Sequence, residues 1–232
     1  KYTGNKFSGS VNLYSTSWKD RVVTSSDVET DPDTGQDIVL YTTNFGVEQL
    51  HTGLEIDGVY RITDALRARG FLSLGNWRYK GNSVTRVADE DQNIIEEEIK
   101  DVDGGEVGDA AQTTFGLGAD WRITERFSID ADYRYYADLY SNVGAVKENL
   151  KLPAFGIMDF GASYRLPIGQ KTNNLYIRGN INNILDTNYI SELSTNIKSE
   201  DGDGVDYYGV DTANRGFVGL GITWNVSVRY NF

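Results

Sequence analysis

Hydrophobic and polar residues alternate strictly along the last part of the chain. Every second residue from Val218 to Phe232 is apolar, and the residues between them are glycine, threonine, asparagine, serine or arginine. A period of two is the signature of a β-strand with one apolar and one polar face. Because ordinary strands have only ~5 to 6 residues, a run of this length favours a strand that crosses a membrane.

The same alternation recurs upstream. Between Phe127 and Leu139 the charged residues Asp130, Asp132 and Arg134 all fall on one face, and apolar or aromatic residues form the other. This pattern predicts further two-faced strands along the chain. The eight predicted strands cover residues 7–13, 54–62, 66–74, 115–123, 127–139, 158–166, 175–181 and 218–232.

The connections between these strands alternate in length. Short connections fall at residues 63–64, 124–126 and 167–173. Long polar connections fall at residues 19–45, 80–112, 140–154 and 186–215. Short periplasmic turns and long extracellular loops are typical of outer-membrane barrels. We therefore predict an all-β fold, an antiparallel transmembrane β-barrel with eight strands present in the chain.

The composition argues against a membrane-spanning helix and against a nucleic-acid partner. The 232 residues include 25 Gly and 15 Tyr but only 3 Pro and no Cys, and no stretch approaches the ~18 to 20 apolar residues of a membrane-spanning helix. The mean hydropathy of −0.44 is polar, as expected when apolar and polar residues alternate. The net charge of −12 argues against a nucleic-acid partner, since phosphate binding requires basic patches.

Two simpler architectures also fit the alternation. A soluble eight-stranded barrel of the lipocalin type would place the apolar face inside and the polar face outside. Arginines and carboxylates in most strands, with tryptophan and tyrosine near strand ends, favour a wet lumen and aromatic girdles instead. A complete eight-stranded outer-membrane barrel with a structural or adhesion role remains an alternative.

The sequence shows no pattern typical of a catalytic site. The only histidine, His51, has no Gly-x-Ser-x-Gly elbow to accompany it and is interpreted as an exposed loop residue at a strand entry. The glycines of Gly116-Leu117-Gly118 and Gly219-Leu220-Gly221 lack the third glycine and the helix of a phosphate loop, so we expect lumen-facing strand glycines. Asp130 and Asp132, followed by Arg134, are expected to form a mutually compensated lumen wall. We predict no enzyme.

The long connections are acidic. Residues 86–109 hold ten carboxylates against Arg86 and Lys100, which is typical of a solvated loop. Asp201, Asp203 and Asp206, and the stretch 31–37, place oxygen ligands at a spacing suited to Ca²⁺. Because neither completes an EF-hand loop, we expect no cofactor and keep Ca²⁺ as a weak candidate at Asp201, Asp203 and Asp206.

Two segments resemble a known family. Residues 180–189, Asn-Ile-Asn-Asn-Ile-Leu-Asp-Thr-Asn-Tyr, and the closing residues 221–232 are similar to the last strands of TonB-dependent receptors, the large outer-membrane transporters with a plugged lumen. Trp18-Lys19-Asp20-Arg21 and residues 50–57 match more weakly. The ending with Trp224, Tyr230 and Phe232 resembles the insertion signal that many outer-membrane barrels share, which implies the barrel assembly machinery as a partner.

The resemblance implies a larger assembly. Such receptors have 22 strands around a plug, so residues 1–232 would be the last eight strands, a C-terminal segment without the plug. The implied partners are outer-membrane lipid, the plug and remaining strands of the same receptor, the TonB complex and, as a further candidate, a surface lipoprotein.

The implied function is energy-coupled uptake of a scarce or bulky nutrient, such as a metal chelate, vitamin, oligosaccharide or peptide. Small ligand sites favour aromatic residues with a few polar groups. We expect the ligand to touch Trp77, Tyr79, Arg134 and Tyr136 on the lumen face.

Overall fold

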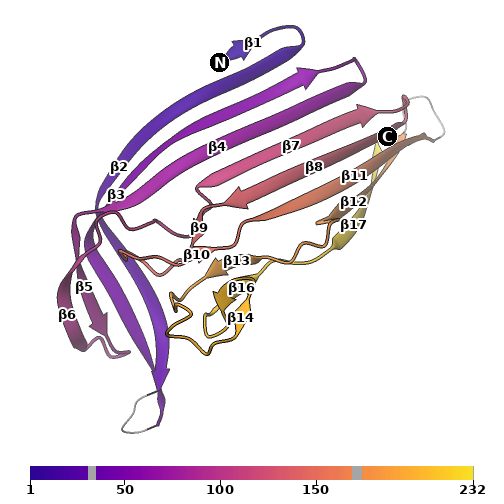
Figure 1. The fold of residues 1–232 in the computed structure, drawn as a ribbon. Helices are drawn as coiled ribbons and strands as arrows, with labels where there is room; N and C mark the ends of the chain where they lie inside the picture. Colours follow the sequence, from indigo (N-terminus) through magenta and orange to yellow (C-terminus); the bar gives the residue numbers. More distant parts are fainter. Residues whose placement is uncertain (31–34, 169–173, 232) are drawn as a thin grey trace.

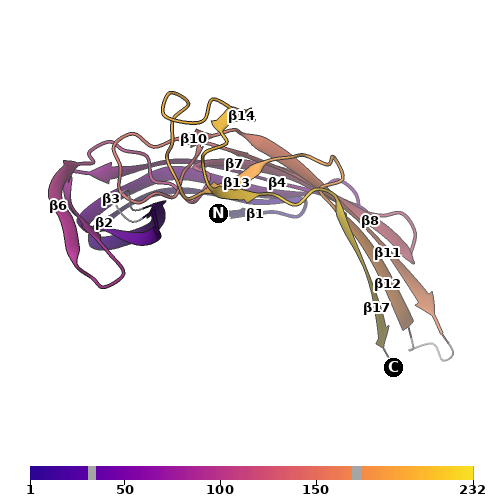
Figure 2. The same ribbon diagram turned by 90° about the horizontal axis from the view of Figure 1, so that it is seen from below.

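The chain forms one large antiparallel sheet that curves into an arch (Figures 1 and 2). A computed structural model describes residues 1–30, 35–168 and 174–231. The sheet order is β1-β2-β3-β4-β7-β8-β11-β12-β17, and β5 and β6 extend it beside β3. Among the described residues, no helix is long and apolar enough to cross a membrane.

Eight long strands form the wall of the arch, and each contains most of one predicted strand. Their bounds are Phe7–Thr30 (β2), Asp37–Arg61 (β3), Leu66–Lys80 (β4), Thr113–Arg122 (β7), Phe127–Ala137 (β8), Phe155–Pro167 (β11), Asn174–Asn182 (β12) and Thr223–Asn231 (β17). Within the described residues, β1 (Tyr2–Thr3) and β17 are the two ends of the sheet and do not pair with each other. The sheet is therefore open, as expected for a part of a wider barrel.

Strands β2 and β3 are much longer than predicted. The expected loop over residues 19–45 is wrong over most of its length, because the two strands pair from Phe7↔Tyr60 to Thr30↔Asp37 with irregularities near Arg21. At ~3.3 Å per residue and ~45° tilt, the 25 residues of β3 rise ~57 Å, well beyond a membrane band of ~25 Å. The outer half lies beyond this band, and its buried residues include the polar Asn44 and Gln49 beside Val47, so its sequence loses the one-sided apolar pattern.

The predicted loop at residues 80–112 also contains strands. Asn82–Ala88 (β5) and Ile94–Asp101 (β6) form a hairpin, and β5 pairs with residues 41–45 of β3. The other two predicted long loops carry short pairs only. They are Leu139–Tyr140 (β9) with Lys151–Leu152 (β10), Ile190–Leu193 (β13) with Gly216–Val218 (β16), and Asp206–Tyr207 (β14) with Val210–Asp211 (β15).

The last strand is shorter than its alternation suggested. The chain leaves β16 at Val218 and enters β17 only at Thr223, so Gly219 and Gly221 lie outside any strand. The prediction of strand glycines at Gly116 and Gly118 is confirmed, since β7 contains both, and they lie opposite Arg134 and Asp132. Gly219 donates its backbone NH to the Tyr189 carbonyl oxygen at 2.8 Å, and Ile222 donates to Asp186 at 2.9 Å. These loop contacts replace strand pairing at this point.

The short turns and the C-terminal strand end lie at the same end of the arch (Figure 1). Turns at residues 61–66, 122–127 and 167–174 connect β3 to β4, β7 to β8 and β11 to β12. The longer connections and the β5–β6 hairpin lie at the opposite end. This arrangement confirms the predicted division into a short-turn side and a long-loop side.

Candidate ligand-binding surface on the polar face

The register divides the wall into two faces. On one face, Leu54 lies opposite Leu74, and Gly179 lies opposite Val226. On the other face, charged residues pair between different strands. Arg69 contacts Asp120 and lies 2.5 Å from an Asp132 oxygen. We call the charged side the polar face and expect it to line the lumen.

The charges on the polar face compensate one another across strands rather than along them. Asp130 pairs with Arg178 at 2.7 Å, Asp132 pairs with Arg69, and Arg134 pairs with Asp159. The prediction that Arg134 compensates Asp130 and Asp132 along one strand is therefore wrong. The register explains these partners. Gly118 of β7 lies between Arg69 and Asp132, and Gly161 of β11 lies beside Asp130 and Arg178, so no side chain separates either pair. Arg134 and Asp159 lie on the neighbouring strands β8 and β11.

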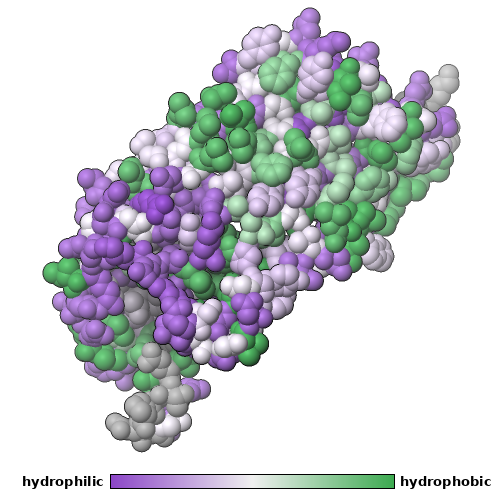
Figure 3. Space-filling model, in the orientation of Figure 1, coloured by the Kyte–Doolittle hydropathy of each residue, from purple (hydrophilic) through white to green (hydrophobic). Residues whose placement is uncertain are grey.

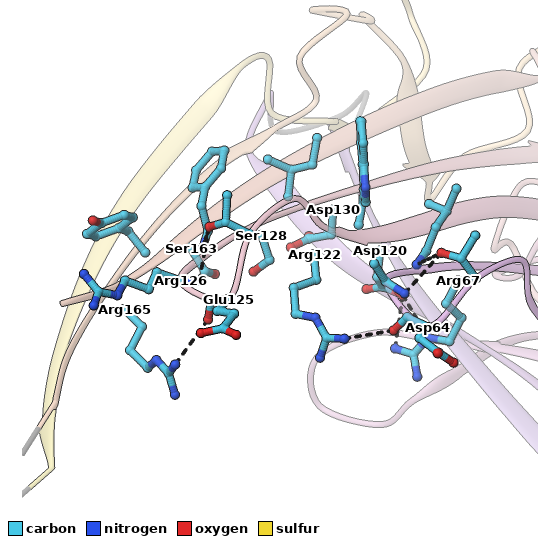
Figure 4. A pocket seen from close by; sticks show the side chains of 18 of the residues that line it. Asp64, Arg67, Asp120, Arg122, Glu125, Arg126, Ser128, Asp130, Ser163 and Arg165 are labelled. Atoms are coloured by element: carbon cyan, nitrogen blue, oxygen red, sulfur yellow. Dashed lines mark hydrogen bonds and ion pairs between the residues drawn. The ribbon is translucent and has the colours of Figure 1, made fainter. Parts of the chain in front are cut away.

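A hollow of about 660 Å³ lies on the polar face beside the short turns (Figure 4). Arg67, Asp120, Asp130 and Arg178 line it from the strands, with the ion pairs described above. At its rim, Arg122 donates to the Asp64 carbonyl oxygen at 3.1 Å. No pattern in the sequence indicated this hollow, because its residues come from turns and strands far apart in the chain.

Aromatic side chains gather toward the other end of the polar face. Trp77 lies 11 residues beyond Leu66 in β4, and Tyr136 lies nine residues beyond Phe127 in β8. At ~2.3 Å of depth per tilted residue, these positions are ~25 Å and ~21 Å from the short turns. Both residues therefore lie near the long-loop edge of a ~25 Å membrane band, at the mouth of the lumen.

One cluster is a stack around the only histidine. The His51 ring lies between Trp18 (centroids 5.7 Å apart, planes at 11°) and Trp77 (5.0 Å, 9°). The Arg21 guanidinium covers Trp18 at 4.9 Å, and Trp77 Nε1 donates to the Tyr14 hydroxyl at 2.9 Å. The interpretation of His51 as a loop residue is wrong, because β3 contains it and the two indoles hold it. We call this group the tryptophan stack.

A second cluster surrounds Tyr136. Its ring stacks on Phe155 with centroids 5.0 Å apart, and Phe155 stacks on Tyr189 at 4.1 Å. Tyr136 and Phe155 are direct partners across β8 and β11, and Tyr189 comes from the segment after β12. We call this group the tyrosine stack. Sequence reasoning missed Phe155 and Tyr189, since each lies at or beyond a predicted strand end.

The four predicted ligand residues therefore have different environments. Trp77 and Tyr136 belong to the two stacks, and Arg134 is held by Asp159. Tyr79 is only 3% exposed and packs in a cluster with Val47, Val102, Val107 and Ala145. Their roles in ligand binding stay predictions.

The segment around Asp201, Asp203 and Asp206, which we call the acidic turn, uses carboxylates to accept hydrogen bonds from its own residues. Asp203 accepts from the Val205 NH and the Thr212 hydroxyl, both at 2.8 Å, and Asp206 accepts from the Gly209 NH at 2.7 Å. In the described ranges, no group of three or more His, Cys, Asp or Glu side chains is placed to share a metal ion. Calcium at Asp201, Asp203 and Asp206 stays a prediction, and residues 31–34 of the other acidic stretch lie outside the described residues.

The residues of the C-terminal signal lie on the apolar face or beyond the described chain. Trp224 and Tyr230 alternate with polar residues in β17 and are 76% and 47% exposed. Phe232 lies outside the described residues. Exposed aromatic side chains on this face are typical of a wall that meets lipid.

A protein-family model matches most of this chain. Residues 1–184 match the model of a family described as "TonB dependent receptor-like, beta-barrel". The chain belongs to this family. TonB-dependent receptor barrels lie in the outer membrane and are transporters rather than enzymes, so the apolar face of the arch meets outer-membrane lipid.

Solved structures share the fold of this receptor segment at low sequence identity. The copper transporter OprC has a TM-score of 0.62 at 14% identity, with 100% of this chain and 30% of that chain covered. A mutant of the ferric enterobactin receptor PfeA from Pseudomonas aeruginosa gives 0.58 at 14%, covering 98% and 29%. The ferric citrate transporter FecA gives 0.55 at 14%, covering 99% and 37%. The chain thus spans about a third of these proteins, and no curated protein matches it.

Proposed function

We propose that this segment is part of the barrel wall of a receptor that takes up a scarce or bulky nutrient across the outer membrane by TonB-coupled transport. Family membership supports a plug and a TonB interaction in the full receptor. The two-faced wall supports a polar path through the membrane, because charged side chains compensate one another on the lumen side. The expected partners are the plug and remaining strands of the same receptor, the TonB complex and the barrel assembly machinery.

The observation that carries the proposal is the pair of aromatic stacks at the lumen mouth. Ligand sites combine aromatic surface with a few well-placed polar groups. The tyrosine stack offers ring surface beside the Arg134–Asp159 ion pair, since Phe155 and Asp159 share one face of β11. The tryptophan stack offers indole surface beside Gln49, whose side-chain oxygen accepts from Arg21 at 2.5 Å. Both fit a bulky organic cargo with flat or ring-shaped parts.

A metal ion or metal chelate is the first cargo to test. The structural neighbours are named for copper, ferric enterobactin and ferric citrate. At 14% identity they support the fold alone, so they suggest where to begin. A vitamin, an oligosaccharide or a peptide would also fit aromatic surfaces and would be tested next.

The test compares two adjacent tyrosines of β8 in the full-length receptor. Tyr136 lies on the polar face opposite Phe155, whereas Tyr135 lies on the apolar face opposite Gly156. Radiolabelled copper, ferric citrate and ferric enterobactin are offered to energised cells, followed by labelled oligosaccharides, vitamins and peptides. We expect Tyr136→Ala to weaken binding about tenfold, which corresponds to ~1.4 kcal/mol. The control Tyr135→Ala leaves binding unchanged.

Energy coupling is tested on the same cells. Collapse of the proton gradient should stop uptake while surface binding remains. Equal binding losses in Tyr135→Ala and Tyr136→Ala would contradict the proposed site, and uptake that persists without a proton gradient would contradict TonB coupling.

A further inference from the structure

In the described membrane-spanning part of the wall, several glycines lie on the apolar face, and all but one of these are covered by a neighbouring side chain. The Phe7 ring lies over Gly9 and Gly58, Leu117 lies over Gly70, and Tyr133 lies over Gly156. Gly179 in β12 differs, because a methyl group placed on it would meet no atom within 4 Å. The protein thus leaves the space above Gly179 unfilled.

This space is part of an apolar groove of about 430 Å³ between β11, β12 and β17. Phe160, Ile181, Trp224 and Val226 form its sides, with Gly179 among its lining residues. Trp224 is 76% exposed and Val226 is 60% exposed, so large apolar side chains flank the groove without closing it. Figure 3 shows hydrophobic side chains gathered over this part of the sheet. The groove therefore leaves apolar surface that nothing in the described chain covers.

The depth of the groove identifies what can reach it. Gly179 lies five residues beyond Asn174, and Ile181, which is opposite Trp224, lies seven residues beyond it. At ~2.3 Å of depth per residue these positions are ~12 and ~16 Å above the short-turn end of a ~25 Å apolar band. The groove therefore spans the middle of the membrane and extends toward the long-loop side, where the surrounding medium is hydrocarbon.

We propose that the groove around Gly179 is a binding site for one acyl chain of a membrane lipid. A hollow without partner atoms loses the dispersion contacts of its lining. A flexible hydrocarbon chain restores these contacts without burying a polar group, whereas a headgroup at this depth would lose its water. The proposal rests on the membrane position of the wall and is independent of cargo uptake. It implies that lipid is retained here longer than on the rest of the apolar face.

The test uses the full-length receptor in phosphatidylcholine vesicles that contain a small fraction of lipid with a diazirine in its acyl chain. Illumination attaches the chain to nearby side chains, and mass spectrometry locates the adducts. We expect several-fold more label on the peptides with Phe160, Ile181 and Trp224 than on the β7 peptide with Leu117 and Trp121, which also lies on the apolar face. Gly179→Leu places a branched side chain in the groove and should lower its labelling several-fold.

The matched control adds the same side chain to the same face outside the groove. Ala119 in β7 lies on the apolar face between Ala68 and Ala131, so Ala119→Leu should leave labelling of the groove unchanged. Heat-modifiable gel mobility checks that each variant folds. If the leucine variant fails to fold, two other measurements test lipid binding in the groove. One is the labelling of Gly179→Ala, which adds one methyl group, and the other is the difference in labelling between the groove and β7 in the unsubstituted receptor.

Three outcomes would overturn the proposal. One is equal labelling of the groove and β7. Another is labelling that Gly179→Leu leaves unchanged. The third is protection of the groove together with crosslinks between two receptors, which would show that a second copy covers it. None of these results bears on nutrient uptake, so the two proposals fail separately.

Discussion

The wall and the long loops of this protein use apolar side chains in opposite ways. On the wall, Leu13 is 77% exposed, Leu117 63% and Trp224 76%. In the loops, Leu152 is 2% exposed and Val102 is 1% exposed, each inside a small hydrophobic cluster. Within the described residues, the buried hydrophobic residues other than Ala88 belong to these clusters at the loop side, while the membrane-spanning strands have an apolar surface rather than a core.

The difference teaches that each region is built for its own solvent. The loops are in water, so the hydrophobic effect drives Leu139, Leu152 and Ile190 together as in a soluble domain. The wall is in lipid, where backbone groups must find their hydrogen bonds inside the sheet and apolar side chains can face outward. One chain therefore contains two kinds of hydrophobic region, separated by the membrane surface.

The largest expected effect is in the loop core. Leu152→Ala removes a fully buried side chain from the cluster with Leu139, Ile190, Leu193 and Val210, and it should destabilise that loop unit by ~2 to 5 kcal/mol. Hydrogen exchange of residues 139–152 and 190–210 measures the change. Leu117→Ala on the lipid face should leave no cavity, since lipid fills the space. A similar loss of loop protection in both variants would erase the proposed distinction.

A charge on the lipid face should have a slightly smaller effect. Val226 lies near the middle of β17 on the apolar face, and Val226→Arg should cost ~2 to 4 kcal/mol and lower the yield of folded barrel. Asn225→Arg, one residue away on the polar face opposite Asn180, should be tolerated. Heat-modifiable mobility reports the yield. Val226→Trp separates lipid from a packed interior, because only a packed interior would be overfilled, at ~1 to 3 kcal/mol.

The smallest expected effect is a pH dependence in the acidic turn. Asp211 is 3% exposed and accepts hydrogen bonds from the Ala213 NH at 2.9 Å and from the Asp203 and Gly204 NH groups at 3.1 Å. These hydrogen bonds lower the pKa of the Asp211 carboxyl from its usual 3.8, and the bond from the Ala213 NH has the largest effect. The stabilisation is therefore complete well above pH 3.8 and is lost as the pH falls through the lower, folded-state pKa.

Asp211→Asn tests this pH dependence. The variant should remove it and leave residues 200–215 several-fold less protected at neutral pH, as hydrogen exchange corrected for its intrinsic pH dependence would show. Loss of protection already at pH 5 in the unsubstituted receptor would contradict the lowered pKa. Added Ca²⁺ at millimolar concentration, with Asp203→Ala as the control, tests the calcium prediction on the same turn.

The sequence by itself determined the wall. Alternation fixed which residues of β7, β8, β11, β12 and β17 face lipid, because the side-chain period of a strand is two and lipid selects one face. It located all eight long strands and the side of the short turns. The resemblance of residues 180–189 and 221–232 to TonB-dependent receptors indicated the family that residues 1–184 confirm.

Only the tertiary structure decided what happens beyond the membrane-spanning part of the strands. The outer halves of β2 and β3 and the β5–β6 hairpin are strands without one-sided apolar patterning, since their buried positions include polar residues such as Asn44, Ser83 and Thr85. The partners of Asp130, Asp132 and Arg134 lie on other strands, so their pairing depends on register. The stack of His51 between Trp18 and Trp77 joins three strands, and the open space over Gly179 depends on which neighbours fail to cover it. These features are set by contacts between residues distant in the chain, which a period of two does not encode.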